Sequence, residues 1–401
     1  MEPGVNHRLD VLESSYTIMV DEFDELVDRY GSDVIKLTTG QPSIPPPRQI
    51  RVTIADKLVK EDMKLYKYPP GFGLPELREA IAEDLNRLGG PKINSDEVVV
   101  VAGGQHAMFV AFSSIMENGD EIIITDPCYF GYPSLIRYLG GKIRRVPTLV
   151  EEGFKLDIEA IKSAIRKGST KAIVVADPDN PTGRVLTREE ARALAELAVD
   201  YKLWLIVDEA YMTLVYEGEK SWPFKYAPDN TIGLYTFSKD PGIPGWRLGY
   251  IYARKDLSRK MSLLSRETIY SPPSIAQYLV LEYLVNWNER RSFIEYSKNI
   301  YKKRRDAMLK SLKEYIENAV LSKPHGAMFI MADLSHYIKD KRIDSVRLAK
   351  ILLDRVKVAA VPGSYFGEST IYSLRFSFPG EPVERIIEGV RRIGDLLNTL
   401  H

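Results

Sequence analysis

The feature that most constrains the fold is a series of short, continuous apolar segments, each of which ends abruptly in a polar or Gly/Pro-rich cluster. The segments are Val98–Val101, Ile122–Ile124, Ala172–Ala176, Leu203–Val207 and Ile232–Phe237. Segments without polar alternation are typical of strands covered on both faces, as in a parallel sheet. The helix-like stretch Arg188–Asp200 between two of them fits a crossover connection. The sequence therefore predicts an α/β fold with a large, mostly parallel sheet covered by helices.

The chain changes character near Asn286, where a long and highly charged helix is predicted. We interpret the Arg/Lys cluster within it as a solvated face. Mixed short strands and helices follow, and an amphipathic helix from Val383 ends the chain. The predicted division is a large domain over residues 46–285 and a smaller α/β domain over residues 286–401, completed by the N-terminal segment 1–45. The Pro-rich stretch Ser43–Pro47 is interpreted as a connection between them.

Composition excludes several classes of function. Lys+Arg and Asp+Glu both number 55, which argues against non-specific binding to nucleic acids or membrane surfaces. The single cysteine, Cys128, cannot form an internal disulfide and is interpreted as a packing residue. With five histidines and no spaced Cys/His set, no metal site is expected, and His106 and His325 are interpreted as structural. Without a signal-peptide pattern, a cytoplasmic protein is expected.

Polar residues follow each apolar segment, at the edge of a parallel sheet where ligands bind. In chain order they are Gly103-Gly104-Gln105, Tyr129, Asn180 within DPDNPTG, Asp208 and Tyr211, and Ser238-Lys239 with Arg247 downstream. Taken singly, each is explained by a helix cap, a turn or a surface charge. Together they supply an anion-binding turn, an aromatic ring, an amide, a carboxylate, a phenol, a lysine and an arginine. This inventory suits a phosphorylated aromatic aldehyde that forms an imine with the lysine.

The same motifs, in this order and spacing, resemble the fold type I pyridoxal-phosphate aminotransferases of class I and II. The resemblance covers nearly the whole chain and is carried by NPTG at Asn180–Gly183, by the Asp208/Tyr211 pair, and by the Ser238-Lys239 stretch that continues to GWRLGY. It implies an enzyme that moves an amino group from an L-amino acid to a 2-oxo acid with pyridoxal 5'-phosphate. Substrates of the aspartate/glutamate, aromatic and alanine classes all stay open.

The resemblance also implies a role for each matching residue at the cofactor. Lys239 forms the Schiff base and shuttles a proton, for which burial suits a lysine by lowering its pKa. Asp208 pairs with the pyridine nitrogen and keeps it protonated. Asn180 and Tyr211 hydrogen-bond the phenolic oxygen of the ring. The implied phosphate ligands are Arg247, Ser238, Thr236 and the N–H groups of Gly104 and Gln105, and Tyr129 is implied to stack on the ring.

Arg375 is the predicted ligand of the substrate α-carboxylate. Its strand alternates, with Leu374 and Phe376 pointing one way and Ser373 and Arg375 the other. The apolar side chains are expected to face the core, which leaves Arg375 on a polar face with room for a ligand. Alternation alone leaves open a structural ion pair, but the resemblance places the carboxylate-binding arginine in this motif. It also implies that Gly40, in KLTTGQP, lines the substrate.

Two further residues are implied to act across a homodimer with shared active sites. Tyr68, with Tyr66 as its rival, matches a tyrosine that reaches the phosphate of the neighbouring subunit. Arg266, before the Tyr-Ser-Pro-Pro turn, matches an arginine that pairs with a substrate's side-chain carboxylate in one branch of the family. A surface or interface ion pair is an equal alternative for Arg266.

Departures and rivals remain. Asp177 and Asp179 stand before NPTG, where amides are more usual, and Gln105 stands where one aspartate-specific subgroup has a lysine. The same apparatus serves pyridoxal-phosphate lyases and synthases, such as C–S lyases, so these are the alternative function. A transcription regulator with this fold needs a basic DNA-binding segment, and the stretch before Lys36 is short and acidic.

Overall fold

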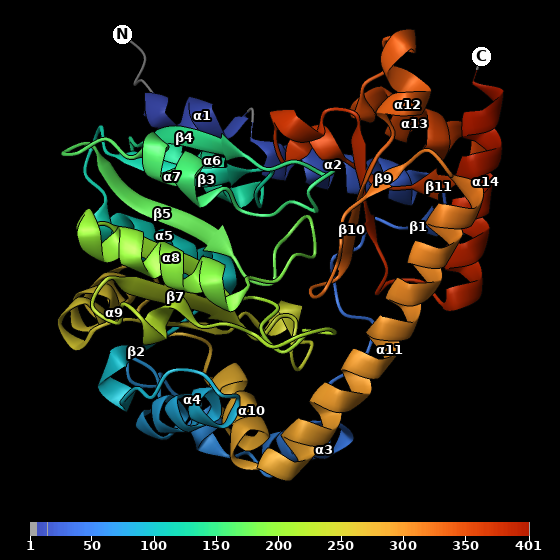
Figure 1. Cartoon of the computed structure of the whole chain (residues 1–401). Helices are drawn as coiled ribbons and strands as arrows, with labels where there is room; N and C mark the ends of the chain where they lie inside the picture. Colours follow the sequence, from blue (N-terminus) through green and yellow to red (C-terminus); the bar gives the residue numbers. More distant parts are fainter. Residues whose placement is uncertain (1–5, 14, 401) are drawn as a thin grey trace, which may run out of the picture.

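A seven-stranded sheet forms the centre of the larger part of the molecule (Figure 1). The computed structural model describes residues 6–13 and 15–400. The strand order is β2-β8-β7-β6-β5-β3-β4. Strand β8 is antiparallel to β2 and β7, and all the other neighbouring pairs are parallel. The strands are β2 (Val98–Val101), β3 (Glu121–Asp126), β4 (Lys142–Pro147), β5 (Thr170–Ala176), β6 (Trp204–Asp208), β7 (Thr231–Thr236) and β8 (Gly249–Tyr252). The predicted α/β fold with a mostly parallel sheet is confirmed.

Burial on both faces explains why the strand sequences do not alternate. In β6, Ile206 packs into one hydrophobic cluster with helix α5, whereas Leu205 and Val207 pack into another with helix α8. The helices of this part are α3 (Arg48–Val59), α4 (Pro75–Arg87), α5 (Gly103–Ile115), α6 (Gly131–Tyr138), α7 (Ile158–Ala164), α8 (Arg188–Asp200), α9 (Lys255–Ile269) and α10 (Ser274–Val285). Helix α8 has the predicted bounds because Thr187 and Glu190 form a reciprocal capping box at its start.

Two strands of this sheet were not predicted from the sequence. Strand β4 reads KIRRVP and lies at the edge of the sheet, where Arg144 and Arg145 are only partly buried. Strand β8 reads GYIY and is antiparallel. Strand β4 lacks the continuous apolar character of a covered strand, so the pattern used for the others does not detect it. Strand β8 is apolar and buried, but it begins within the GWRLGY motif, which was interpreted for its function.

The smaller part contains a four-stranded antiparallel sheet of order β12-β13-β10-β9 and a two-stranded pair β1-β11. Its elements are β1 (Ile35–Lys36), β9 (Val320–Leu321), β10 (Phe329–Asp333), β11 (Val358–Ala359), β12 (Val361–Pro362), β13 (Ser373–Ser377), α2 (Tyr16–Arg29), α12 (Ser335–Ile338), α13 (Ser345–Val356) and α14 (Val383–Thr399). The short helix α1 (Asp10–Glu13) instead lies against α6 of the larger part (Figure 1). The N-terminal segment reaches this part because β1 pairs in parallel with β11. The predicted domain boundary at residue 286 stays a prediction. Residues 1–5, 14 and 401, which the prediction assigns to the smaller domain, lie outside the described residues.

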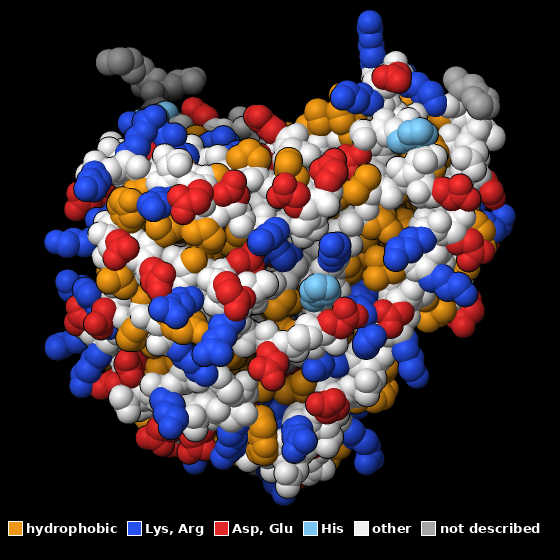
Figure 2. Space-filling model, viewed as in Figure 1, with side chains coloured by type: hydrophobic (Ala, Val, Ile, Leu, Met, Phe, Trp, Pro, Cys, Tyr) orange, Lys and Arg blue, Asp and Glu red, His pale blue; other side chains and the backbone are white. Residues whose placement is uncertain are grey.

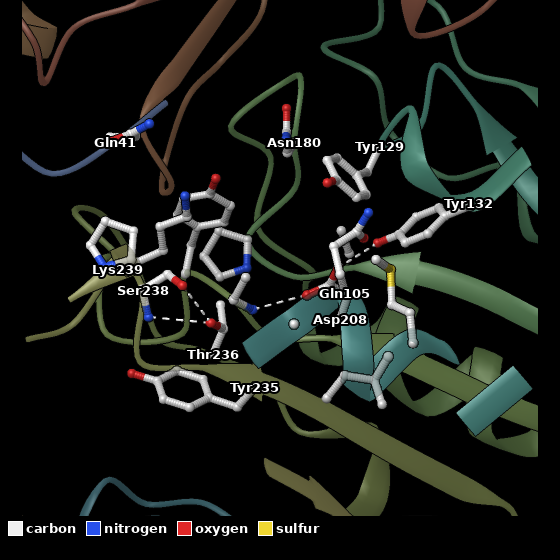
Figure 3. Close-up of a pocket in the computed structure, with 18 of the residues that line it drawn as sticks. Gln41, Gln105, Tyr129, Tyr132, Asn180, Asp208, Tyr235, Thr236, Ser238 and Lys239 are labelled. Atoms are coloured by element: carbon white, nitrogen blue, oxygen red, sulfur yellow. Dashed lines mark hydrogen bonds between the residues drawn. The ribbon is translucent and has the colours of Figure 1, made fainter. Parts of the chain in front are cut away.

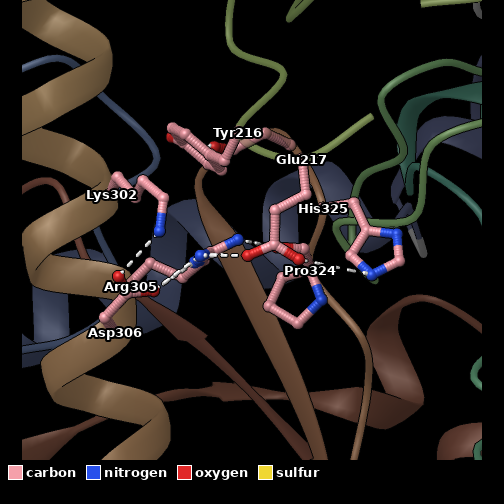
Figure 4. Close-up of polar contacts among 8 residues, drawn as sticks. Tyr216, Glu217, Lys302, Arg305, Asp306, Pro324 and His325 are labelled. Carbon is pink, nitrogen blue, oxygen red and sulfur yellow. Dashed lines mark hydrogen bonds and ion pairs between the residues drawn. The ribbon is translucent and has the colours of Figure 1, made fainter. Parts of the chain in front are cut away.

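Helix α11 (Trp287–Tyr315) links the two parts (Figure 1). The predicted long charged helix is confirmed, but the interpretation of its basic cluster as a solvated face is wrong for Arg290 and Arg305, which are buried. Arg305 donates to Glu217 of the larger part at 2.6 Å and to the carbonyl oxygen of Pro324 at 2.9 Å (Figure 4). Buried arginines need such partners, so these two side chains are structural contacts.

Acidic and basic side chains alternate over the face seen in Figure 2, in keeping with the balanced charge of the sequence. Among the helices of the described residues, none is both long and apolar enough to span a bilayer. The described residues also contain no group of three or more His, Cys, Asp or Glu side chains arranged to hold a metal ion.

Candidate active site

A cavity of about 250 Å³ opens beyond the carboxyl ends of β5, β6 and β7 (Figure 3). These parallel strands end together because Ala176 is in register with Asp208, and Asp208 with Leu234. The sequence-predicted residues that line the cavity are Gly104, Gln105, Tyr129, Asn180, Asp208, Tyr211, Thr236, Ser238, Lys239 and Arg247. The structure therefore brings the strand-end residues to one site.

An anion-binding corner lies where helix α5 begins. Gly103 has a φ of +83°, and a Cβ added there would lie 2.8 Å from Nη2 of Arg247. Only glycine therefore fits beside this guanidinium. Arg247 itself adopts the left-handed region with a φ of +52°, a conformation that is costly for a side-chain-bearing residue and is found at functional sites. The helix N-terminus, the guanidinium and the hydroxyls of Thr236 and Ser238 form a donor set complementary to a phosphate.

Lys239 lies in the cavity with its amine directed at the N-terminal segment. Its Nζ donates a hydrogen bond of 2.8 Å to the carbonyl oxygen of Gly40. Burial, with repulsion from Arg375 and Arg247, lowers the pKa of Lys239 to about 8, although Asp208 opposes the shift. A substantial fraction of this amine is therefore neutral near neutral pH and able to act as a nucleophile or base.

Among the described residues that line the cavity, Asp208 is the only carboxylate. Its Oδ2 accepts a hydrogen bond of 2.8 Å from the hydroxyl of Tyr132, and its Oδ1 accepts one of 3.1 Å from the N–H of Ala210. Burial raises the pKa of Asp208, whereas these two donors favour its charged form. A cation placed against this carboxylate would lower its pKa and be held strongly.

Tyr132 was missed by the sequence analysis. It lies on helix α6, three residues after Tyr129, and the two rings contact edge to face at a centroid distance of 5.4 Å. The spacing of the two tyrosines was the available signal, but the sequence shows no link between Tyr132 and Asp208. Tyr132 and Asp208 are 76 positions apart in the sequence, and they become neighbours only through the order of β3, β5 and β6 in the sheet.

Arg375 is buried beside Asn180 and offers unused donors. Its Nη1 donates to Oδ1 of Asn180 and its Nη2 to the carbonyl oxygen of Thr38, each at 3.1 Å, while its Nε has no partner. Within the described part of the chain, no acidic side chain forms an ion pair with it. The rings of Phe329 and Phe366 lie 4.3 and 4.8 Å from its guanidinium. A buried, unpaired arginine of this kind suits a ligand carboxylate.

The environment of Arg375 differs in one respect from the expectation. The alternation is as predicted, since Leu374 and Phe376 point into the hydrophobic core of the smaller part. The opposite face was expected to be open, yet Ser373, Arg375 and Ser377 are all buried. They are covered because the N-terminal segment crosses this face, where Thr38 accepts from both Arg375 and Ser377.

Tyr68 and Arg266 lie outside the cavity of their own chain. Tyr68 is 81% exposed and Tyr66 60%, and Arg266 is also exposed. The ring of Tyr68 contacts Tyr270 edge to face at 5.0 Å, and the guanidinium of Arg266 lies 5.7 Å from the same ring. The two residues thus share one exposed surface, and neither is brought to the cavity within a single chain.

The unusual acids before Asn180 have structural partners. Asp177 is fully buried and accepts from Lys220 at 2.7 Å and from the N–H of Leu186 at 2.8 Å. Asp179 accepts from the hydroxyl and the N–H of Thr182, which closes the turn. The sequence did not predict these pairings because Lys220 is 43 residues from Asp177.

Known proteins are similar to this chain both in sequence and in architecture. The family described as aminotransferase class I and II matches residues 32–393. The aspartate/prephenate aminotransferase of Thermus thermophilus is 35% identical over 390 residues, which cover 97% of this chain and 98% of that protein. The structure of Thermus thermophilus aspartate aminotransferase with maleate superposes with a TM-score of 0.91 at 35% identity, covering 98% of this chain and all of that chain.

The chain belongs to the class I and II aminotransferases. A further neighbour, the aromatic aminotransferase of Pyrococcus horikoshii, superposes with a TM-score of 0.85 at 29% identity and covers 95% of this chain and 99% of that one. The aminotransferase therefore catalyses transfer of an amino group, and the lyase or synthase alternative is not what these relatives favour.

The donor set of the aminotransferase fits the phosphorylated pyridine aldehyde that the sequence resemblance implies. The corner formed by Gly103 and Arg247 suits its phosphate, and Asp208 suits its ring nitrogen. Lys239 supplies an amine of lowered pKa for the aldehyde, and Arg375 remains available to a substrate carboxylate. No residue that lines the cavity conflicts with such a ligand.

The lowered pKa of Lys239 can be tested in the protein without cofactor. An amine-reactive label followed by peptide mass spectrometry should modify Lys239 with a midpoint near pH 8, below the ordinary lysine value of 10.5. Arg375→Leu should move the midpoint upward because it removes a repelling charge, and Asp208→Asn should move it downward because it removes an attracting one. A midpoint at the ordinary lysine value, or shifts of the opposite sign, would contradict this description of the cavity.

Proposed function

We propose that this chain is a pyridoxal-phosphate aminotransferase in which Lys239 carries the cofactor. The observation on which the proposal depends is an amine of lowered pKa that lines the same cavity as Asp208 and the phosphate-binding corner. When bound, pyridoxal phosphate supplies an electron-accepting ring that stabilises negative charge at the substrate Cα. A cytoplasmic location, which the sequence predicts, belongs to the same proposal.

The chain's own residues have distinct tasks in this proposal. Lys239 would take the proton from the substrate Cα and deliver it to the cofactor. A pKa near the working pH is favourable for both transfers. Asp208 holds a proton on the ring nitrogen, and Tyr132 and the N–H of Ala210 keep the carboxylate oriented. Asn180 and Tyr211 bind the phenolic oxygen. Burial raises the pKa of Tyr211, so its hydroxyl remains a donor.

Substrate binding is assigned to the side of the cavity at Asn180, next to which Arg375 lies. Arg375 binds the α-carboxylate with the donors that it does not use within the chain, and Asn180 fixes its guanidinium from the large sheet. The peptide of Gly40 lies beside the reacting amine. Tyr129 covers the ring, and the phosphate ligands are Arg247, Thr236, Ser238 and the N–H groups of Gly104 and Gln105.

The side-chain specificity of this proposal depends on a dimer. Lys239, Arg247 and Arg375 are all committed to the cofactor or the α-carboxylate, and the turn at Gln105 carries no charge. A second substrate carboxylate therefore requires a cation from elsewhere. We assign this role to Arg266 of the partner subunit, and the phosphate contact to Tyr68 of the partner subunit. Their shared exposed surface beside Tyr270 supports both assignments.

Replacement of Lys239 tests the proposal most directly. Lys239→Ala should fold and retain some affinity for pyridoxal phosphate through the phosphate-binding corner. Its turnover should fall by several orders of magnitude, because both the covalent attachment and the proton carrier are lost. Steady-state transamination and circular dichroism measure the two effects. A variant with undiminished turnover excludes Lys239 as the catalytic residue.

The dimer assignment can be tested with two tyrosines that lie two residues apart. Tyr68→Phe should weaken retention of pyridoxal phosphate by about ten-fold, the effect of one hydrogen bond to a charged group. Tyr66→Phe, the matched control, should change retention by less than about two-fold on the same scale. Equilibrium dialysis gives the affinities, and sedimentation velocity gives the oligomeric state. An active monomer contradicts both the role of Tyr68 and the shared site.

Arg266 can be tested by comparing substrate classes. Loss of a desolvated arginine–carboxylate pair costs about 2–5 kcal/mol, so Arg266→Ala should reduce kcat/KM for aspartate or glutamate by about 30-fold or more. Activity on alanine or phenylalanine should barely change. An equal loss on both classes would identify Arg266 as an interface residue, and no loss on either would remove it from the site.

A further inference from the structure

Asp240, the residue that follows Lys239, is held through all three of its oxygen atoms. Its Oδ1 accepts from the hydroxyl of Tyr283, and its Oδ2 accepts from Nη1 of Arg290 at 2.9 Å. Its carbonyl oxygen accepts from the hydroxyl of Tyr235 at 3.3 Å. Asp240 is 3% exposed, so solvent does not compete for these bonds. The backbone next to the proposed catalytic amine is therefore fixed by its immediate neighbour.

The cation in this contact is the fully buried Arg290, in the first turn of helix α11. Its Nη2 donates to Oδ2 of Asp84 at 2.7 Å and its Nε to Oδ1, which makes a bidentate pair with helix α4. Tyr283 comes from helix α10, and α4, α10 and the start of α11 gather at one end of the molecule (Figure 1). The guanidinium thus joins three helices to the segment that carries Lys239.

The same combination of groups recurs behind Asp208. The following residue, Glu209, forms an ion pair with Lys220 at 3.0 Å and accepts a hydrogen bond of 2.6 Å from the hydroxyl of Tyr252, and Lys220 also pairs with Asp177. Each cluster contains one cation with a largely buried side chain, two buried carboxylates and at least one phenol. Each also holds the residue immediately after one that lines the cavity, Asp208 in one case and Lys239 in the other.

Stability alone does not explain clusters of this kind. Two carboxylates and one cation must lose their hydration, and apolar side chains in their place are often as stable or more so. What the cluster does supply is geometry, since a planar guanidinium with two fixed partners permits only one arrangement. A misplacement of a catalytic group by about 1 Å costs on the order of 100-fold in rate, so a rigid support for Lys239 has a clear use.

We propose that Arg290 is a positioning residue for Lys239, acting through Asp240. It touches neither substrate nor cofactor, and it sets where the lysine amine stands relative to a ligand held at the phosphate-binding corner. The inference rests on the proposed function, because it takes Lys239 as the cofactor-carrying residue.

Two alanine variants of the same cluster separate positioning from stability. Asp240→Ala cuts the tie to Lys239 and leaves Arg290 paired with Asp84, so no buried charge loses all its partners. Asp84→Ala, the matched control, removes an equally buried carboxylate from the same arginine but keeps the contact between Arg290 and Asp240. A purely structural cluster makes the two variants behave alike.

The readout is the affinity of each apoprotein for two forms of the cofactor. Pyridoxal phosphate reacts with Lys239: the amine nitrogen forms a double bond to the aldehyde carbon, and the aldehyde oxygen leaves as water with the two amine protons. Pyridoxamine phosphate has the same ring and phosphate but no aldehyde, so it binds without that bond. Asp240→Ala should weaken binding of pyridoxal phosphate by about ten-fold or more and that of pyridoxamine phosphate by less than about two-fold. Asp84→Ala should show a smaller difference between the two ligands.

The remaining outcomes overturn the inference. Equal weakening of both ligands in Asp240→Ala means that the cluster supports the whole cavity, and no weakening of either means that Lys239 needs no such support. If circular dichroism shows that Asp240→Ala does not fold, Asp240→Asn replaces it, since the amide has the same shape without the charge, and the same criteria apply.

Failure of the proposed function looks different in the same measurements. Borohydride reduction of the wild-type protein with pyridoxal phosphate should fix the cofactor on Lys239, as peptide mass spectrometry would show. Attachment at another residue, or none, refutes the proposed function irrespective of Asp240. Attachment at Lys239 with an unaltered Asp240→Ala variant refutes only the role of Arg290.

Discussion

The parallel pairing of β5, β6 and β7 is the constraint on which the rest of this structure depends. Two ladders pair Ala176 with Asp208 and Asp208 with Leu234, two residues before Thr236, so that the turns following these strands line one cavity. No single turn contains enough groups for chemistry. The site exists because backbone hydrogen bonds between strands place a carboxylate, an amide-bearing turn and a lysine around one volume, with helix α5 closing one side.

Positive charge exceeds negative charge at this edge of the sheet. Lys239, Arg247 and Arg375 are three cations in or beside the cavity, against one lining carboxylate, Asp208. Burial lowers the pKa of Arg375 to about 10 and that of Lys239 to about 8, and repulsion from the neighbouring arginines adds to the shift of Lys239. A dianionic phosphate alone would offset the two surplus positive charges. Affinity for such ligands is thus built into the empty arrangement of charges.

The sequence was sufficient where a local pattern determines the structure, and insufficient where partners are distant. Continuous apolar segments identified five of the seven strands of the large sheet, and the strand-end motifs identified ten of the residues that line the cavity but not Tyr132. The burial of Arg290 was not foreseen, because on a charged helix it resembles its exposed neighbours, and its partner Asp84 lies 206 residues away. The carbonyl of Gly40 meets Lys239 across 199 residues for the same reason. Such contacts follow from the assembled topology, which no short window of residues contains.

The length of helix α11 has a mechanical consequence. It is one uninterrupted helix of 29 residues, anchored at its first turn by Arg290 and packed further along against α14 and β10 of the smaller part. At 1.5 Å per residue it is a lever of roughly 43 Å, and one degree of tilt at the anchored end displaces the other by about 0.75 Å. The anchored end of the helix contacts Asp240, next to Lys239 in the sequence. Farther along, the helix packs against β10, which pairs with β13, the strand that carries Arg375. A tilt of this helix would therefore move Arg375 relative to Lys239, and the direct hydrogen bond between Arg375 and Asn180 opposes such a movement.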